Sequence, residues 1–365
     1  MHLSKPQHAV LSKQCKLKRD WIEYMNRPLL SICIPSYNRT RQLVELLHSI
    51  DCDPSNVEIV ICEDGSPQRN EIRVAVEAFS GSSKYKIRYF ENEANFGFDG
   101  NLRRLIERAT GKFVLFMGDD DLFVPRALDR FLDFLIKHGD VKYILRSYIT
   151  IHPDGRTENF RYLPKEAKLP YGETTVAWLF KRSVTICGFT ISRDDALKLS
   201  TSDLDGTLLY QVYLMAQVCL QHDSIYCDFP VAHAVQSFRE DKPMFGNSEV
   251  EKSRYTPGTV SQDNSINFTK AYFEVTAYLD KQHDTHLTGL VRTDLSKYSY
   301  PFLSIQRKRG IGTFLQYAKR LENEAGFGCT PYFYMYKWGL VLLGEKVCDW
   351  LIVRIKNSLG YTPNL

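Results

Sequence analysis

The stretch Phe113-Val-Leu-Phe-Met-Gly-Asp-Asp-Asp121 places three consecutive aspartates directly after a short apolar run. An apolar run of this length, bounded by turn residues, predicts a buried strand. Like charges this close raise one another's pKa, so the cluster is unfavourable unless a cation or hydrogen bonds compensate. Carboxylate oxygens suit Mg²⁺ and Mn²⁺, which often complete their shell with phosphate oxygens. A solvated turn, or the start of a helix near Pro125, is the structural alternative.

Strand-like and helix-like segments alternate around this cluster. Strands are predicted at 29–34, 57–62, 85–90 and 113–117, and helices at 40–50, 71–79 and 101–109. This rhythm predicts an α/β fold with a mainly parallel central sheet flanked by helices. In such sheets ligands bind beyond the carboxyl ends of the strands, and a second acidic turn, Glu63-Asp64, also follows a strand. The two acidic turns together indicate a metal-diphosphate site.

The second half of the chain is less regular. Strands are predicted at 141–151, 186–192 and 224–231, helices start at 194 and 208, and the polar stretch from 240 to 267 is expected to be a loop. Three further helices, at 268–280, 287–298 and 311–325, predict a C-terminal helical extension.

Composition narrows the class of protein. The 365 residues hold 47 Lys and Arg against 43 Asp and Glu, and a net charge of +4 is too small to indicate nucleic acid as the main partner. The 21 Phe and 21 Tyr exclude a disordered chain. Nine scattered cysteines without zinc spacing predict neither a disulfide framework nor a structural metal, with Cys33 and Cys62 buried in strands, and favour a reducing cytoplasm. No targeting segment or spanning helix is expected.

Four motifs occur in order between residues 29 and 128. They are Ser31-Ile-Cys-Ile-Pro-Ser-Tyr-Asn-Arg39, Val60-Ile-Cys-Glu-Asp-Gly-Ser66, Asn95-Phe-Gly97 with Asn101, and Phe116-Met-Gly-Asp-Asp-Asp-Leu122. This series resembles the motifs of family-2 glycosyltransferases, and is most similar to bacterial O-antigen and capsule enzymes of the abequosyltransferase-like type. The resemblance implies the GT-A (nucleotide-diphospho-sugar transferase) fold and a nucleotide-sugar donor.

The resemblance also implies roles for individual residues. It places the first loop against the base and ribose, Asp64 on the pyrimidine ring or ribose, and the aspartates on a Mn²⁺ or Mg²⁺ ion at the diphosphate. The commonest form of the motif has an aspartate where Gly118 stands, so Asp119 is expected to have taken over the ribose contact. The nucleotide-binding residues implied are Pro35, Ser36, Tyr37, Arg39, Asp64, Asn95, Gly97, Asp119 and Asp120, and the metal ligands are Asp120, Asp121 and His233. A structural role is the alternative for His233.

The family's inverting reaction needs a carboxylate base on the acceptor side, usually in a Glu-Asp pair before a helix of the second half. This chain has no such pair, and Asp205, before the helix predicted from Leu208, is the candidate, with Asp203 in reserve. Alternatively, Asp205 or Thr207 is only the N-cap of that helix. Arg239 and Lys242 are candidates for diphosphate contact, or simply a solvated basic loop.

The chain is expected to divide into a basic extension (1–28), a nucleotide-sugar-binding half (29–128), an acceptor-binding half (129–245) and a helical C-terminal region (246–365). One amphipathic helix near 332–356 is predicted to bear aromatic residues beside basic ones. Such a helix suits an anionic membrane surface, whereas packing on the catalytic domain or in a dimer interface is the alternative.

The function expected is an inverting, metal-dependent glycosyltransferase of the cytoplasm or of the inner face of the cytoplasmic membrane. It would transfer a hexosyl or deoxyhexosyl group from a nucleotide-diphosphate sugar, with a pyrimidine base, to a glycan on a lipid such as a polyprenyl diphosphate, in surface polysaccharide or O-antigen biosynthesis. A sugar-phosphate nucleotidyltransferase is one alternative, although its Gly-rich, Arg-containing loop after the first strand is missing. A catalytically degenerate module that binds a nucleotide or a partner is the other.

Overall fold

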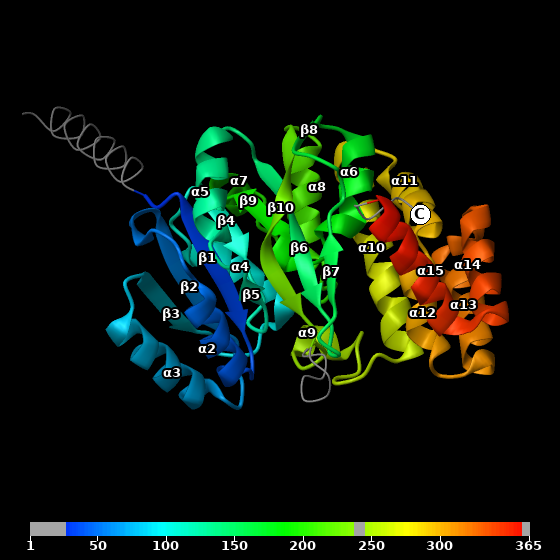
Figure 1. The fold of residues 1–365 in the computed structure, drawn as a ribbon, viewed down its shortest axis with the longest axis horizontal. Helices are drawn as coiled ribbons and strands as arrows, with labels where there is room; N and C mark the ends of the chain where they lie inside the picture. Colours follow the sequence, from blue (N-terminus) through cyan, green and yellow to red (C-terminus); the bar gives the residue numbers. More distant parts are fainter. Residues whose placement is uncertain (1–26, 237–244, 360–365) are drawn as a thin grey trace, which may run out of the picture.

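A ten-stranded sheet runs through the molecule in the order β3-β2-β1-β4-β9-β6-β10-β5, with β7 paired to β6 and β8 to β10 (Figure 1). The computed structural model describes residues 27–236 and 245–359. The strands are β1 (Leu30–Ser36), β2 (Val57–Glu63), β3 (Lys86–Glu91), β4 (Phe113–Phe116), β5 (Leu122–Phe123), β6 (Tyr143–Ile151), β7 (Thr157–Phe160), β8 (Ala167–Leu169), β9 (Phe189–Ser192) and β10 (Ser224–Val235).

The first four predicted strands are all parallel to one another and form one end of the sheet. β1 is parallel to β2 and to β4, and β2 is parallel to β3. The predicted α/β alternation is therefore confirmed. Because β1, β2 and β4 run in the same direction, the residues that follow them meet at one edge of the sheet.

The remaining strands continue this sheet instead of forming a second one. β9 is antiparallel to both β4 and β6, β6 is parallel to β10, and β5 is antiparallel to β10. The loop between β4 and β5 therefore starts in the first half of the chain and ends against the last strand of the second half. The expected nucleotide-binding and acceptor-binding halves share one sheet.

Helices cover both faces of the sheet, each over its own apolar core. On one face, α2 (Thr40–Ser49), α3 (Arg69–Ser82) and α5 (Ala127–Lys137) bury leucine, isoleucine and phenylalanine side chains against β1, β2 and β4. On the other face lie α4 (Gly97–Arg108), α6 (Glu173–Phe180), α7 (Arg193–Lys198) and α8 (Tyr210–Cys219). Of these, α8 is buried along its whole length, because the C-terminal helices cover it.

The C-terminal region is helical, as predicted, and lies at the end of the molecule opposite β3 and α3 (Figure 1). Its core is continuous with the core around α4 and α8, since Phe314 and Phe333 belong to the same buried cluster as Leu209. Its helices are α9 (Glu249–Lys252), α10 (Gln262–His283), α11 (Leu287–Lys297), α12 (Tyr300–Arg307), α13 (Ile311–Ala325), α14 (Pro331–Leu342) and α15 (Gly344–Leu359).

Two predictions about this region are wrong. The loop expected up to residue 267 contains α9, and α10 begins at Gln262, where the Ser261 side chain accepts the N–H of Asn264. The single amphipathic helix near 332–356 is two helices, α14 and α15. Gly344 between them has φ +73°, a left-handed conformation that glycine adopts without steric cost and that ends α14.

Further elements were not predicted because their local patterns are weak. They are α6, β7, β8 and α12, which are short or lie in polar stretches. The eight cysteines within the described residues are free thiols, and Cys33 and Cys62 are fully buried in β1 and β2, as predicted. In the described ranges no helix is long and apolar enough to cross a membrane.

Candidate functional site

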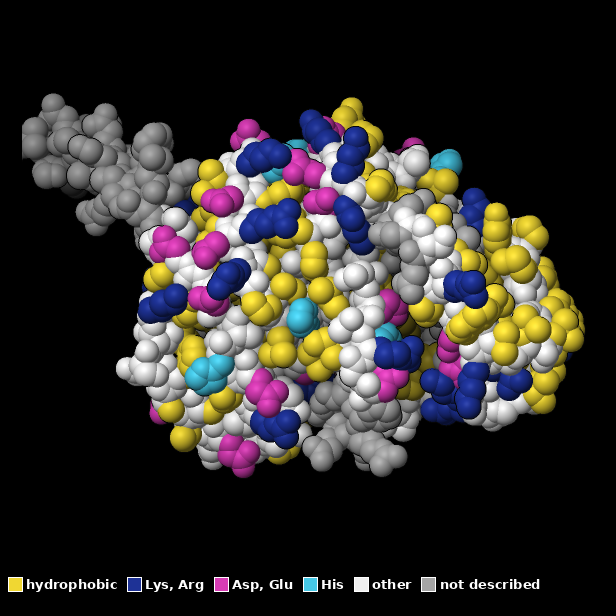
Figure 2. All heavy atoms as spheres, in the orientation of Figure 1, with side chains coloured by type: hydrophobic (Ala, Val, Ile, Leu, Met, Phe, Trp, Pro, Cys, Tyr) yellow, Lys and Arg dark blue, Asp and Glu magenta, His cyan; other side chains and the backbone are white. Residues whose placement is uncertain are grey.

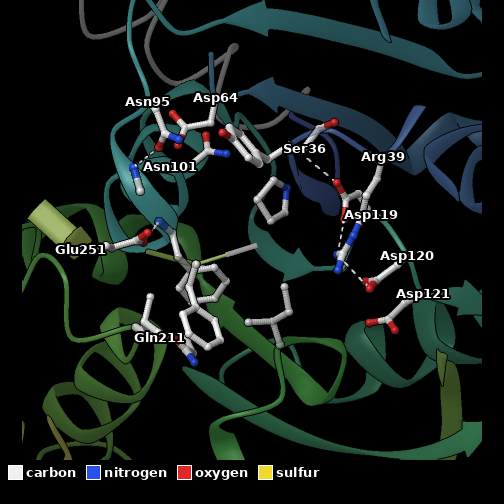
Figure 3. A pocket seen from close by; sticks show the side chains of 18 of the residues that line it. Ser36, Arg39, Asp64, Asn95, Asn101, Asp119, Asp120, Asp121, Gln211 and Glu251 are labelled. Atoms are coloured by element: carbon white, nitrogen blue, oxygen red, sulfur yellow. Dashed lines mark hydrogen bonds and ion pairs between the residues drawn. The ribbon is translucent and has the colours of Figure 1, made fainter. Parts of the chain in front are cut away.

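A cavity of about 420 Å³ opens at the carboxyl ends of β1, β2 and β4 (Figure 3). Side chains from both halves of the sheet and from the C-terminal region line it. Ten of the twelve residues proposed from the sequence are among them: Pro35, Ser36, Tyr37, Arg39, Asp64, Asn95, Gly97, Asp119, Asp120 and Asp121. The other two, Asp205 and His233, do not line it.

One wall of the cavity is an acidic cluster whose charge is partly compensated by Arg39. The Nη1 atom of Arg39 lies 3.0 Å from Oδ1 of Asp119 and 2.8 Å from Oδ2 of Asp120. The backbone N–H of Tyr37 donates to the other oxygen of Asp119, at 3.0 Å. The loop after β1 therefore supplies both donors that hold the loop after β4, which is the positioning expected of a parallel strand pair.

The third aspartate faces the last strand. Oδ1 of Asp121 accepts the backbone N–H of Val235, in β10, at 3.0 Å. Burial, opposed by Arg39, raises the pKa of Asp119 to about 7, and burial together with the charge of Asp120 raises the pKa of Asp121 well above its usual range. Both shifts mean that the charged forms are costly here without an additional cation.

The opposite end of the cavity is built around Asp64. Its Oδ1 accepts hydrogen bonds from Nδ2 of Asn92 (2.8 Å) and from the backbone N–H of Phe96 (3.1 Å). Asn92 also donates to Asn101, which in turn donates to the carbonyl of Cys62, so a buried amide chain fixes the carboxylate. Burial, opposed by these donors, raises the pKa of Asp64 to about 6.

Glu251 is a lining residue that the sequence did not reveal. Its carboxylate, on α9, accepts the N–H of Phe98 in the first turn of α4 and the N–H of Gly246, both at 2.8 Å. Gly97 permits this approach, because it has φ +76° and an added Cβ would lie 2.7 Å from Oε1 of Glu251. Nothing in the sequence pointed to Glu251, because it lies in a stretch that was expected to be a loop.

The floor of the cavity, between Asp64 and the acidic cluster, is mainly apolar. It consists of Phe98, Val184, Ile186, Leu208, Phe245 and Phe268, together with the amide of Gln211. Gln211, in the first turn of α8, donates to the carbonyl of Val184 at 2.8 Å, and its Oε1 has no hydrogen-bond partner among the described residues. No sequence motif identified these residues, which come from five separate segments.

The N-terminus of α8 is capped from another helix. The Asp99 carboxylate, on α4, accepts the N–H of Leu208 (2.8 Å) and of Tyr210 (2.9 Å), while Thr207 Oγ1 accepts the N–H of Leu209 at 3.2 Å. Burial raises the pKa of Asp99 to about 7. Of the two caps considered from the sequence, Thr207 contributes, whereas Asp205 does not.

Asp205 instead forms a two-point ion pair with Arg103 of α4. The Arg103 nitrogens Nη1 and Nη2 lie 2.5 Å and 2.7 Å from its two oxygens. Asp203, the reserve candidate, accepts the hydroxyl of Tyr278 at 3.0 Å and does not line the cavity either. Asp205 as the catalytic base stays a prediction, and the paired guanidinium counts against it because both carboxylate oxygens are occupied.

The residues present fit a divalent cation through Asp120 and Asp121. Magnesium sites commonly use one or two carboxylates together with substrate phosphates, and the raised pKa of buried Asp121 indicates an unmet need for positive charge. His233 lies opposite Leu122 in the β10–β5 pair, outside the cavity lining. Within 27–236 and 245–359, no group of three His, Cys, Asp or Glu side chains could hold a metal by itself. Arg239 and Lys242 lie outside the described residues.

Because Gly118 has no side chain, the carboxylates of Asp120 and Asp121 can lie close to its backbone. An added Cβ would lie 2.9 Å from Oδ2 of Asp121 and 3.0 Å from Oδ1 of Asp120, so both carboxylates must move. We expect Gly118→Ala to lower the free energy of unfolding by about 1–3 kcal/mol, measured by urea denaturation. Gly289→Ala is the control, because its added Cβ meets no atom within 4 Å and it lies inside α11. Equal stability of the two variants would contradict this account.

The chain resembles known proteins in its sequence and in its fold. Residues 31–199 match the family described as glycosyl transferase family 2. Abequosyltransferase RfbV of Salmonella typhimurium is 29% identical over 114 residues, which are 31% of this chain and 34% of that protein. The UDP-Glc:alpha-D-GlcNAc-diphosphoundecaprenol beta-1,3-glucosyltransferase WfgD of Escherichia coli is 26% identical over 129 residues, 35% of this chain and 49% of that protein. The match thus spans between a third and a half of these relatives.

The fold match is longer than the sequence matches. The crystal structure of S. aureus TarS 1-349 in complex with UDP-GlcNAc matches with a TM-score of 0.53 at 14% identity, over 91% of this chain and 92% of that chain. This likeness shows the fold. The fold is thus of the GT-A type, as expected, and residues 31–199 are similar to glycosyl transferase family 2.

Proposed function

We propose that this protein is a glycosyltransferase that transfers a sugar, with inversion, from a nucleotide-diphosphate donor to a hydroxyl group of a glycan. One observation carries the proposal: a single cavity has the Asp64 carboxylate at one end and Arg39 with Asp119, Asp120 and Asp121 at the other. A nucleotide diphosphate needs a hydrogen-bonding site for its base and a separate charged site for its phosphates, and the cavity offers both.

The donor would lie along the carboxyl edge of the sheet. In this proposal Asp64 accepts a ring N–H of a pyrimidine, the loop Pro35 to Tyr37 and Asp119 contact the base and ribose, and Arg39 contacts the diphosphate. Asp120 and Asp121 would hold Mn²⁺ or Mg²⁺, which when bound supplies positive charge to the departing diphosphate. His233 is left out of this ligand set because it does not line the cavity.

The sugar would then rest on the apolar floor near Gln211. An acceptor hydroxyl would attack the anomeric carbon as the bond to the diphosphate breaks, and its proton would pass to a carboxylate base. Gln211 is well placed to accept a hydrogen bond from a sugar hydroxyl, since its Oε1 has no partner among the described residues. The apolar floor favours a sugar face with few hydroxyl groups, which agrees with hexosyl or deoxyhexosyl transfer.

The names of similar proteins support a lipid-linked glycan as the acceptor. WfgD is named for transfer to a diphosphoundecaprenol-linked sugar, and another similar protein is named a putative colanic acid biosynthesis glycosyl transferase, WcaA of Escherichia coli. We therefore place the proposed reaction in surface polysaccharide biosynthesis, on the cytoplasmic side of the membrane.

The first test is nucleotide binding. Thermal-shift and calorimetric titrations with UDP, CDP, GDP and dTDP, with and without Mn²⁺, should give a metal-dependent affinity for one pyrimidine diphosphate. Asp120→Ala should weaken that affinity at least about tenfold and remove its dependence on Mn²⁺, because it deletes a charged ligand. Asp133→Ala, at an exposed position of α5, is the control and should bind as the wild type does.

The outcomes of this test separate the rival functions. Release of free sugar or its transfer from the bound donor, lost in Asp120→Ala, supports a transferase. Nucleotide binding without turnover would indicate the degenerate binding module. Formation of a nucleotide sugar from a nucleoside triphosphate and a sugar phosphate would indicate a nucleotidyltransferase. No binding by a folded protein would overturn the proposal.

The pH dependence of binding tests the role of Asp64. Burial raises the pKa of this carboxyl to about 6, and its ionised form is the stronger acceptor for a ring N–H. The affinity for the nucleotide should therefore be highest above this pKa and should fall by up to about tenfold per pH unit below it. Calorimetry on the wild type and on Asp64→Asn isolates this effect, because the titration of the nucleotide phosphate is common to both. Identical pH profiles of the two proteins would remove Asp64 from base recognition.

The role of Asp205 is tested by comparing it with its partner. If the ion pair only ties α4 to the segment before α8, Asp205→Asn and Arg103→Gln should lower the free energy of unfolding alike, by about 1–3 kcal/mol, and change kcat by less than about tenfold. If Asp205 is the base, kcat should collapse in Asp205→Asn alone. The ion pair leads us to expect the first outcome, measured by denaturation and initial rates.

A further inference from the structure

The last two helices leave an unusual amount of apolar surface exposed. Of the twenty exposed large apolar side chains within the described residues, twelve lie between Tyr332 and Leu359, on α14 and α15. Figure 2 shows hydrophobic side chains gathered over this end of the molecule. We call these twelve exposed side chains the C-terminal apolar face. A contiguous surface of this kind marks an interaction site, whereas isolated exposed residues do not.

The turn between the two helices is the most exposed part of this face. Leu342 and Leu343 have 79% and 53% of their side chains exposed, directly before Gly344 with its φ of +73°. Each helix also exposes one tryptophan, six residues from Gly344: Trp338 on α14 is 52% exposed and Trp350 on α15 is 56% exposed. Tryptophan and tyrosine at the border of an aliphatic tip are typical of residues that sit at a membrane–water interface.

The charges around the face are mainly positive. Both carboxylates of α14 and α15 have partners: Glu345 pairs with Lys308 at 3.1 Å, and Asp349 accepts the hydroxyl of Tyr300. Lys346 and Arg354 are exposed, and the Arg354 guanidinium lies 5.1 Å from the centre of the Trp350 ring. Apolar, aromatic and basic side chains on one surface complement anionic lipid headgroups over an acyl layer.

We propose that the C-terminal apolar face docks onto an anionic lipid bilayer, with the Leu342-Leu343 turn inserted and α14 and α15 lying at the interface. A second copy of this chain fits this face less well. A two-fold contact would bring the same basic side chains of both copies together, and these would repel one another. The inference deepens the proposed function, since a lipid-linked acceptor would lie in the same bilayer.

Docking in this way would also orient the cavity. Phe333 and Leu340 of α14 belong to the same buried core as α4 and α8, so the face is joined rigidly to the catalytic domain. α10 packs against α11 and α13 and contributes Phe268 to the cavity lining. A bilayer bound at α14 and α15 would therefore hold the acceptor side of the cavity in a fixed relation to the lipid surface.

Vesicle flotation of the full chain tests the proposal. Vesicles of phosphatidylcholine with phosphatidylglycerol should bind the wild type, and vesicles of phosphatidylcholine alone or high salt should weaken binding. The double variant Leu342→Glu/Leu343→Glu should lower the partition coefficient at least about tenfold, because two inserted leucines are replaced by charges repelled by the lipid. Ile136→Glu is the matched control, since Ile136 on α5 is 65% exposed and lies far along the chain from this face.

Three outcomes would overturn the inference. They are no binding of the wild type to anionic vesicles, equal binding of the double variant, and an equal loss in Ile136→Glu. If the wild type does not bind vesicles but forms a dimer in sedimentation velocity, and the double variant is monomeric, the C-terminal apolar face is an interface with a second copy of the chain. Nucleotide binding is measured in parallel without lipid, and the double variant should bind nucleotide as the wild type does. Loss of nucleotide binding would count against the proposed function, whereas loss of vesicle binding alone would count against the membrane inference.

Discussion

The burial of Asp119 and Asp121 on either side of the half-buried Asp120, just after β4, is the constraint on which the site depends. Their charged forms are costly in this position, and the raised pKa values of Asp119 and Asp121 express that cost. The chain offsets this cost with donors from two other strands of the sheet: Arg39 and the Tyr37 N–H after β1, and the Val235 N–H of β10. Because these donors exist only when β1, β4 and β10 share one sheet, the acidic cluster and the topology stabilise each other.

The second organising element is α4, which joins the first half of the sheet, residues 29–128, to the segments that follow it. Near its N-terminus the N–H of Phe98 is capped by Glu251, Asp99 caps α8, and Arg103 pairs with Asp205. These contacts fix the floor of the cavity relative to Asp64. They also give Asp205 a structural explanation that needs no catalytic role, since the Arg103 guanidinium occupies both of its carboxylate oxygens.

The sequence was sufficient for features whose signal is local. The strands ending at Ser36, Glu63 and Phe116 were predicted from apolar runs and turns, and the resemblance placed Asp64 and the three aspartates correctly in one cavity. It was insufficient where function depends on contacts between distant residues. Asp99 reaches Leu208 across 109 positions, and Glu251 reaches Phe98 across 153. No periodicity encodes such pairs, so the roles of Glu251 and of Asp99 as a cap of α8 emerge only from the folded chain.

The apolar pattern of the C-terminal helices does not by itself show which of their side chains are buried. α14 has Lys337 as its single charged residue, but buries only Phe333 and Leu340. A helix that is apolar on all sides is normally enclosed by protein or lies in contact with lipid, because water penalises the remaining face. The protein's own core accounts for the two inward residues and leaves Trp338 and Leu342 unexplained. The break at Gly344 starts a second helix, α15, which exposes a further tryptophan, Trp350. An aromatic, basic and aliphatic surface at one end of the molecule matches the chemistry of a lipid interface better than that of bulk water.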